Sequence, residues 1–313
     1  MPCDWQLIAL IGERHAGTPK NVVLASLGTF EFHAKAAFAT VMLTEALVIT
    51  WISMCATMLY TDPRLWIVVT SSLAFAIVRV VVVPLASAKV KAFPTLSTFG
   101  QLLFSNTLVS MLHSALSSLL AISALLTSHS LNGDYVSTVT RGEFLATSVS
   151  TGYFAYDLWD YVLNGLYVKS PGIVVHHVVV LICYISALTK TVGVPLLSLA
   201  LVCELQSVFM HARKLLVMSN FSVRLSPLLQ WVWRAQWVSF TVARFIPHVA
   251  VAVLTYQAKH LFVQQIHFAM AFGGIIFINL LNVQLLFDVR KACRKDSAPP
   301  KAPPSSVSVL KTP

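Results

Sequence analysis

The sequence predicts an all-α protein, a polytopic transmembrane helix bundle of about eight spans. The first observation is composition: of 313 residues, 57% are hydrophobic and 11% are charged. Soluble domains average about 45–50% and about 25%, so a soluble fold of this chain could not cover its surface with polar groups. The second observation is that the apolar residues form runs of about 20, the length of a membrane-spanning helix. Strands of a membrane barrel are shorter than these runs.

Eight runs qualify as spans. They are Ala36–Tyr60, Leu65–Pro84, Gln101–Leu126, Phe144–Asn164, Gly172–Thr189, Val194–Val217, Leu228–Tyr256 and Leu261–Phe287. The first run is the weakest, because Glu45 lies inside it and a charge within a bilayer is costly. A bundle of seven spans is therefore the alternative.

The Lys and Arg residues between the runs predict the orientation of the chain. Most of them fall on the side that carries both termini, including Lys89, Lys91 and Lys169. Because cytoplasmic loops are enriched in Lys and Arg, we expect both termini in the cytosol. Topology thus accounts for the net charge of +10, and no nucleic-acid partner is expected.

The runs divide the chain into four segments. Residues 1–35 contain several charges and no long apolar core, which predicts a cytosolic N-terminal segment without a cleavable signal peptide. Residues 36–94 contain two N-terminal spans and a loop, and residues 95–290 contain the other six spans. Residues 291–313 are basic and rich in Pro and Ser, which predicts a disordered tail.

The fourth span contains a stripe of polar residues. Asp157 and Asp160 are three residues apart and share one helix face. Tyr153 lies one turn before Asp157, and Asn164 lies one turn after Asp160. Because ionisable groups inside a bilayer face the bundle interior, this stripe is either a buried network that joins helices or part of a functional site. The spacing leaves both interpretations open.

The fifth span opens with His176 and His177. Adjacent helical residues point about 100° apart, so the two imidazoles cannot easily bind one metal ion, and no metal site is expected. One could face the aspartate stripe while the other faces the interior of the bundle. The pair could serve as a general acid or base, with Asp157 and Asp160 as further catalytic candidates, or it could be structural.

Further inward polar groups predict a partly polar cavity inside the bundle. In the sixth span, Glu204, Ser207 and His211 share one face, so Glu204 could orient His211 through Ser207 or water. Basic groups near the cytosolic end would suit an anionic lipid or an acyl-CoA. The candidate residues for lipid binding or a polar core are His113, Tyr153, Asp157, Asp160, His176, His177, Glu204, Ser207, His211, Arg213 and Arg244.

Four stretches follow one another in a recognisable order and spacing. They are Leu108-Val109-Ser110-Met111-Leu112-His113-Ser114, then Ser150-Thr151-Gly152-Tyr153-Phe154-Ala155-Tyr156-Asp157 with Asp160, then Val175-His176-His177-Val178-Val179, and Glu204-Leu205-Gln206-Ser207-Val208-Phe209 with Arg213. In these stretches the chain resembles the TLC-domain family of multispanning membrane proteins, over roughly residues 95–290. The resemblance extends to the group of TLC domain-containing proteins 1 and 2 through Arg244-Phe245-Ile246-Pro247.

The resemblance implies a role in setting the phospholipid composition and fluidity of a membrane, with the plasma membrane favoured over the endoplasmic reticulum. Our leading hypothesis is a protein that binds a phospholipid, an acyl chain or an acyl-CoA within the bundle. It assigns no reaction and no cofactor, and membrane lipids are the expected partners.

Two alternatives remain open. The first is a ceramide-synthase-like acyltransferase that uses acyl-CoA, with His176 or His177 as the base. Ceramide synthases carry a His-Asp-X-X-Asp stretch in the next span, whereas this chain has Cys203-Glu204-Leu205-Gln206-Ser207, and the difference argues against N-acyl transfer. The second is a transporter, which would also use buried carboxylates and histidines, although the sequence shows no pair of helices broken by Gly or Pro.

Overall fold

A computed structural model describes residues 42, 45–46 and 48–297, and every regular element in this part is a helix. The predicted all-α fold is therefore confirmed. Residues 58–313 form one compact unit and residues 1–57 form another. The first predicted span, Ala36–Tyr60, lies partly outside the described residues, and Val48–Thr61 form a short apolar helix.

The helices from residue 63 onward follow the predicted spans closely. The α-helices are α2 (Trp66–Ile77), α3 (Val83–Ser87), α4 (Thr98–Thr127), α5 (Arg141–Leu163), α6 (Pro171–Lys190), α7 (Val194–Leu201), α8 (Glu204–Met218), α9 (Pro227–Ser239), α10 (Ile246–Gln257) and α11 (Gln265–Ser297). Shorter 3₁₀ and π turns join or flank them: η2 (Pro63–Leu65), η3 (Val78–Val82), η4 (Phe93–Thr95), η5 (Ser130–Asn132), η6 (Leu166–Val168), η7 (Phe240–Phe245) and η8 (Ala258–Leu261). Within the described residues, six continuous helices are long and apolar enough to cross a membrane.

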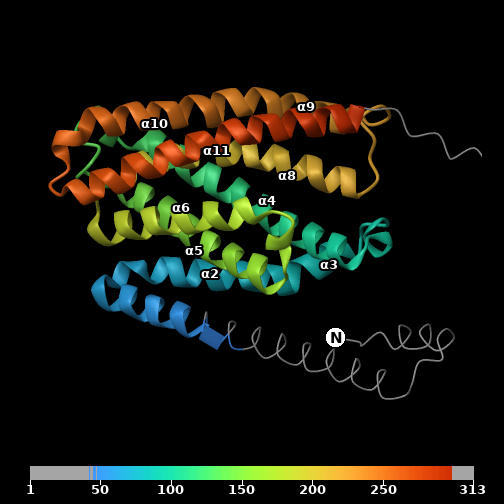
Figure 1. Cartoon of the computed structure of the whole chain (residues 1–313), viewed down its shortest axis with the longest axis horizontal. Coiled ribbons are helices and arrows are strands. Elements are labelled where there is room, and N and C mark those ends of the chain that lie inside the picture. The colour runs from blue at the N-terminus through green and yellow to red at the C-terminus, as the bar shows by residue number, and fades with distance from the viewer. Residues whose placement is uncertain (1–41, 43–44, 47, 298–313) are drawn as a thin grey trace, which may run out of the picture. The chain divides into compact units, whose positions relative to one another are not determined.

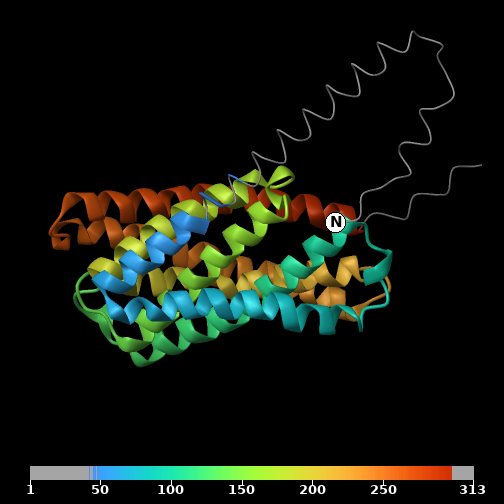
Figure 2. The ribbon, with the colours of Figure 1, turned by 90° about the horizontal axis from the view of Figure 1, so that it is seen from below.

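Six helices of the compact unit form a closed ring. Around the ring, α4 packs against α5, α5 against α6, α6 against α11, α11 against α10, α10 against α7, and α7 again against α4. Helix α8 continues from α7 and packs against α4, while α2 covers α5 from outside the ring. Figure 1 shows α2 on the side of this unit opposite α9, α10 and α11, and in Figure 2 the long helices keep roughly one direction.

Helix α5 is the polar member of this ring. It carries Glu143, Asp157 and Asp160, all buried, and it is not one of the six helices apolar enough to span alone. Its neighbours are α2, α4, α6 and α7. Neighbouring helices, rather than lipid, therefore surround the carboxylates, as polar residues within a bilayer require.

A glycine allows α2 and α5 to approach closely. A Cβ atom added at Gly152 of α5 would lie 2.7 Å from Ser71 Cβ and 2.9 Å from the backbone nitrogen of Ser72, and would overlap the carbonyl oxygen of Val68. Ser71 of α2 donates a hydrogen bond to the carbonyl oxygen of Val149 at 2.8 Å. Small residues at such crossings let helix backbones pack closely in membranes.

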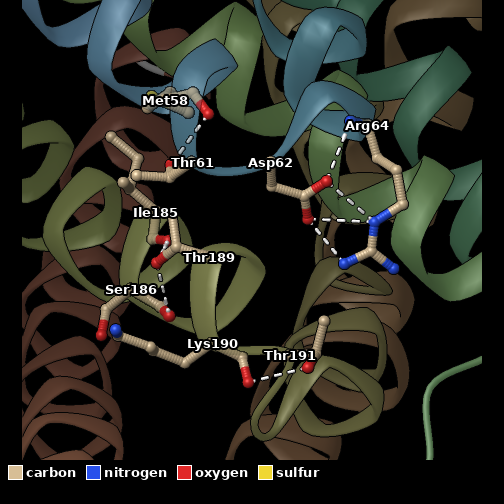
Figure 3. Close-up of polar contacts among 9 residues, drawn as sticks. All are labelled: Met58, Thr61, Asp62, Arg64, Ile185, Ser186, Thr189, Lys190 and Thr191. Atoms are coloured by element: carbon tan, nitrogen blue, oxygen red, sulfur yellow. Dashed lines mark hydrogen bonds and ion pairs between the residues drawn. The ribbon is translucent and has the colours of Figure 1, made fainter.

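Side chains satisfy the backbone at one pair of helix ends (Figure 3). Asp62 caps the turn that starts the helix Pro63–Ser87, accepting from the backbone nitrogen of Arg64 at 2.9 Å and from its guanidinium at 2.6 Å. The Arg64 guanidinium thereby keeps the pKa of the Asp62 carboxyl below its ordinary value. Helix α6 ends where Thr191 adopts a left-handed conformation with φ of 51°.

Two spans contain a π-helical turn just before a proline. Val78–Val82 precede Pro84, and Phe240–Phe245 precede Pro247. Proline lacks an N–H group and leaves a carbonyl without its usual partner, and a local π turn is one way in which a membrane helix accommodates this. Each of these turns carries one arginine, Arg79 or Arg244.

The predicted span Val194–Val217 is interrupted. Helix α7 ends at Leu201 and α8 begins at Glu204, with no Gly or Pro between them. Across the break the backbone N–H groups of Val202 and Cys203 bond to carbonyls three residues earlier, which tightens the turn. The sequence analysis missed this break because apolar periodicity continues through it.

The C-terminal helix is longer than expected. Helix α11 ends at Ser297, so residues 291–297 are helical rather than part of a disordered tail. Arg213 of α8 forms an ion pair with Asp296 at 3.0 Å, and Arg224 donates to the carbonyl oxygen of Ser297 at 3.4 Å. These contacts explain why the last turns of α11 keep their helical form. Residues 298–313 of the predicted tail lie outside the described residues.

Candidate functional site

A cavity of about 820 Å³ lies inside the helix ring. Its lining extends from Lys169, just before α6, to Gly193, just after it. Because α6 has 20 residues, the cavity follows it for about 30 Å. Polar and basic side chains gather toward the end near Lys169, and most side chains toward the other end are apolar. The apolar lining includes Val180, Leu196, Leu197, Ala200, Leu201, Val251, Ile275 and Ile278.

The predicted aspartate stripe forms a buried network among three helices. Asn106 of α4 donates from Nδ2 to Asp157 Oδ1 at 2.7 Å and to Asp160 Oδ2 at 2.9 Å. Asp160 Oδ1 also accepts from Arg79 Nε at 3.2 Å and from Asn164 Nδ2 at 2.9 Å. The stripe therefore joins α4, α5 and the helix that contains Arg79. These contacts correspond to a buried network that joins helices, which is one of the two interpretations of the stripe.

His177 belongs to this network, and both of its ring nitrogens are engaged. Nδ1 lies 2.7 Å from the carbonyl oxygen of Ile173, which only accepts, so this nitrogen carries a proton. Nε2 lies 3.0 Å from Asp157 Oδ2. Either the imidazolium donates to the carboxylate, or a protonated Asp157 donates to the imidazole. In both cases His177 has no lone pair free for a ligand.

His176 differs from its neighbour. It lines the cavity, and within the described residues its ring nitrogens make no hydrogen bond. His211 lines the same cavity, and within the described residues its ring nitrogens also make no hydrogen bond. His248 donates from Nδ1 to the carbonyl oxygen of Arg244 at 2.8 Å, which leaves Nε2 as an acceptor. The adjacent histidines thus separate as expected, one facing the aspartates and one facing the interior.

His113 and Tyr153 pack as a buried pair beside the network. Their rings stack with centroids 3.6 Å apart and planes 6° from parallel. Tyr153 donates its hydroxyl to Ser110 Oγ at 2.9 Å, while His113 Nε2 is buried without a hydrogen-bond partner. Both residues lie on the cavity wall, between α4 and α5.

The predicted relay from Glu204 through Ser207 to His211 is not formed. Glu204 accepts instead from Ser114 Oγ of α4 at 2.6 Å, and Ser207 Oγ accepts from Arg244 Nη2 at 2.6 Å. All three residues line the cavity, but the two oxygen-bearing side chains have taken partners from other helices. His211 is left facing the cavity alone.

Arg244 is the most richly hydrogen-bonded arginine of the cavity. Besides Ser207, it donates from Nε to Gln206 Oε1 at 2.7 Å and from Nη1 to Asn282 Oδ1 at 3.3 Å. Nη2 also lies 3.4 Å from the carbonyl oxygen of Cys203, at the break between α7 and α8. All of these acceptors are uncharged, so the guanidinium keeps its positive charge without a counterion among them.

The sequence suggested Arg213 as a candidate for lipid binding or for a polar core. In the structure its guanidinium contacts protein side chains. Its Nη1 pairs with Asp296 Oδ2 at 3.0 Å, and its guanidinium lies over the Trp233 ring, 4.8 Å from the centroid. The side chain therefore bridges α8, α9 and α11 at the polar end of the cavity, whose lining it shares.

Sequence analysis did not assign several residues that complete the site. Arg79 and Asn106 hold the aspartates, and Gln206 and Asn282 hold Arg244. A charged or amide side chain inside an apolar run was the available signal for each, but nothing in the spacing indicated its partner on another helix. Within the described residues, no group of three or more His, Cys, Asp or Glu side chains is placed to hold a metal ion.

Apolar helices arranged around an internal polar cavity define an integral membrane protein with several spans. Residues 103–291 match the TLC domain, which is more than half of the chain. The chain therefore belongs to the TLC-domain family.

Individual relatives carry the same domain name. TLC domain-containing protein 2 of Danio rerio is 34% identical over 121 residues, which cover 38% of this chain and 48% of the relative. The human protein of that name is 26% identical over 187 residues, covering 59% of this chain and 68% of the relative. TLC domain-containing protein 1 of Gallus gallus is 31% identical over 115 residues, 37% of this chain and 46% of the relative. The chain thus spans about half the length of the zebrafish and chicken proteins. No solved structure matches it significantly.

Proposed function

We propose that this protein binds a lipid or a fatty acyl chain inside its helix ring and thereby regulates the phospholipid composition and fluidity of its membrane. The observation that carries this proposal is the cavity, which is polar toward the end near Lys169 and mainly apolar toward the other end. Ligand pockets usually have volumes of about 300–1,000 Å³, and this one falls within that range. A length of about 30 Å suits an extended acyl chain with its polar group.

The orientation and the membrane belong to the same proposal. The polar end of the cavity carries Lys169 and Lys214, and an excess of Lys and Arg is typical of the cytosolic side. We therefore place this end and both termini on the cytosolic side, in the plasma membrane. A ligand would then enter from the leaflet that carries anionic lipids.

The test is lipid analysis of cells with and without the protein, using a variant that fills the cavity. Ala187 of α6 lines the cavity, whereas Ile182 of the same helix is 55% exposed on the outer face. Ala187→Phe should abolish the difference in phospholipid acyl composition that the wild-type protein produces, and Ile182→Phe should preserve it. Equal activity of both variants at equal abundance would refute binding inside the ring.

An acyltransferase remains the second candidate, and one observation favours a specific version of it. Both histidines line the cavity; within the described residues the ring nitrogens of His176 make no hydrogen bond, whereas both ring nitrogens of His177 are engaged. A hydroxyl or amine nucleophile would attack the thioester carbonyl of an acyl-CoA and the carbon–sulfur bond would break, while His176 would accept the proton of the nucleophile and return it to the leaving thiolate. Purified protein given acyl-CoA and candidate acceptors should then lose its activity in His176→Ala, at unchanged stability.

A further inference from the structure

The charge balance of the cavity is uneven around Arg244. This residue lies midway along the continuous helix Pro227–Leu261, and therefore near the middle of the bilayer. Within the part of the chain that the structure describes, no carboxylate oxygen lies within 4.0 Å of its guanidinium. A cation at this depth is costly unless a partner compensates it.

The carboxylates that line the cavity have their own positions. Asp157 pairs with His177, and Glu204 accepts from Ser114. Asp288 lies on an exposed part of α11, almost two turns beyond Asn282, which contacts Arg244. None of them neutralises Arg244 in this arrangement.

Hydrogen-bond donors also exceed acceptors around this arginine. Gln206 and Asn282 turn their amide oxygens toward the guanidinium, and within the described residues Gln206 Nε2 and Asn282 Nδ2 are buried without an acceptor. A buried donor without an acceptor is unfavourable. The protein groups around Arg244 are therefore short of acceptors, and because Arg244 itself lines the cavity, a negatively charged ligand group there would balance the guanidinium.

From Arg244 toward the C-terminal end of α10, the cavity wall includes an apolar cluster. Along α10 the cavity-lining residues after Arg244 are His248, Val251 and Thr255, spaced so that they lie on one face. Opposite this face stand Leu196 and Ile275, which pack in one apolar cluster with Val251. From Arg244 to Thr255 the helix rises about 16 Å. A single alkyl chain that starts at the guanidinium would lie against this cluster.

We propose that Arg244 binds the anionic headgroup of a single-chain amphiphile, a carboxylate or a phosphate monoester, whose tail lies between α7, α10 and α11. This inference rests on the proposed function, because it assigns a headgroup to the ligand of the same cavity. The headgroup lies at mid-depth of the bilayer, inside the protein, and not at the membrane surface where bilayer lipids keep theirs.

The experiment compares probes that share a twelve-carbon tail. Laurate carries a carboxylate, dodecyl phosphate carries a phosphate monoester, and monolaurin is neutral. The full chain is reconstituted in phosphatidylcholine nanodiscs at pH 8, and each dissociation constant is obtained from the rise of the unfolding temperature with free probe concentration. The wild-type protein should bind at least one anionic probe about 10- to 100-fold more tightly than monolaurin, the preference expected of a charge-assisted hydrogen bond.

Variants test whether Arg244 is the cause. Arg244→Gln should reduce the preference to less than about threefold, and Arg244→Lys should retain part of it, because the charge remains while the two-pronged geometry is lost. Arg234→Gln is the matched control: it removes an exposed arginine from the same continuous helix Pro227–Leu261, outside the cavity lining, and it should keep the wild-type preference. If Arg244→Gln fails to fold, the wild-type probe series and Arg244→Lys still test whether Arg244 binds the anionic headgroup.

The outcomes separate the two proposals. Tight binding of laurate alone identifies a carboxylate site, and tight binding of dodecyl phosphate alone identifies a phosphate site. Equal affinity for all three probes, or a preference that survives Arg244→Gln, overturns the headgroup assignment but leaves lipid binding in place. Failure of all three probes to bind overturns both.

Discussion

Arg79 and Arg244 occupy similar backbone settings and opposite electrostatic ones. Each lies in a π-helical turn that precedes a proline. Arg79 donates to Asp160, in a network where Asp157 is also paired with His177. Among the residues that the structure describes, Arg244 donates to neutral oxygens only, and it faces the cavity. The same local distortion therefore positions two different arginines. Arg79 forms an ion pair between helices, whereas Arg244 lines the cavity without an ion-pair partner among the described residues.

This difference divides the helix ring into a structural side and a ligand side. On the structural side, the two aspartates are matched by an arginine, a histidine and two asparagine amides. On the ligand side, histidines and an arginine line the cavity. Substitutions on the structural side should lower stability, and those on the ligand side should change binding.

The largest expected effect is on the stability of the structural side. Arg79→Gln leaves Asp160 buried without its cation and should lower the free energy of unfolding by about 3–5 kcal/mol. Arg244→Gln breaks hydrogen bonds to neutral groups and should cost about 1 kcal/mol. Unfolding of the full chain in mixed micelles measures both. Adding Asp160→Asn to Arg79→Gln should recover part of the loss, and equal costs for the two single variants would contradict the division.

The adjacent histidines provide a second test. His177→Ala removes a buried hydrogen bond to Asp157 and should lower stability by about 1–3 kcal/mol. His176→Ala removes no hydrogen bond within the described residues and should change the unfolding temperature little. Thermal unfolding followed by near-ultraviolet circular dichroism checks the pair. A larger loss in His176→Ala would show that the two roles are reversed.

The closeness of α2 and α5 gives a smaller effect. Gly152→Ala would place a methyl group against the backbone of α2, so we expect a loss of about 1–3 kcal/mol. Gly273→Ala is the matched control, since an added Cβ there meets nothing within 4 Å. It should be neutral or slightly stabilising, because alanine favours helix. Similar losses in the two variants would mean that the α2–α5 crossing is not tightly packed.

The smallest effect concerns a loop outside the membrane. The backbone N–H groups of Ser137 and Val136 donate to Asp134 and keep the pKa of its carboxyl below the ordinary value. Because the folded pKa is the lower one, this stabilisation is complete above the unfolded value near pH 4 and is lost as the pH falls through the folded pKa. Asp134→Asn should remove that part of the acid dependence in unfolding curves between about pH 5 and pH 2, while an unchanged profile would contradict the assignment.

Much of the fold could be predicted because membranes restrict it. From Leu65 onward each apolar run is helical, and most ends lie within a few residues of the predicted ones, since only helices and closed barrels satisfy the backbone in lipid. The break at Val202 and Cys203 could not be predicted, because neither residue disfavours helix strongly. The final turns to Ser297 were missed because the partners of that segment, Arg213 and Arg224, lie far away in sequence.

For the candidate site, the sequence predicted which residues take part better than it predicted which side chains contact one another. Helical spacing was sufficient to place Asp157 and Asp160 on one face and to separate His176 from His177. It could not show that Arg79 would contact Asp160 on a neighbouring helix. The direct relay through Ser207 suggested for Glu204 and His211 is not formed for the same reason: partners on α4 and η7 compete for the same side chains, and only packing decides.

The polarity of α5 bears on how this protein is made. A segment with two aspartates in its last third partitions poorly into lipid by itself, since a charge costs up to about 2.5–3.5 kcal/mol at the centre of a helix. Its partners Asn106 and Arg79 precede it in the chain, whereas His177 follows it. Helices that are translated earlier therefore carry the first hydrogen-bond partners of α5, and the imidazole of the next helix completes the network afterwards. We expect assembly in the membrane to follow the order of translation.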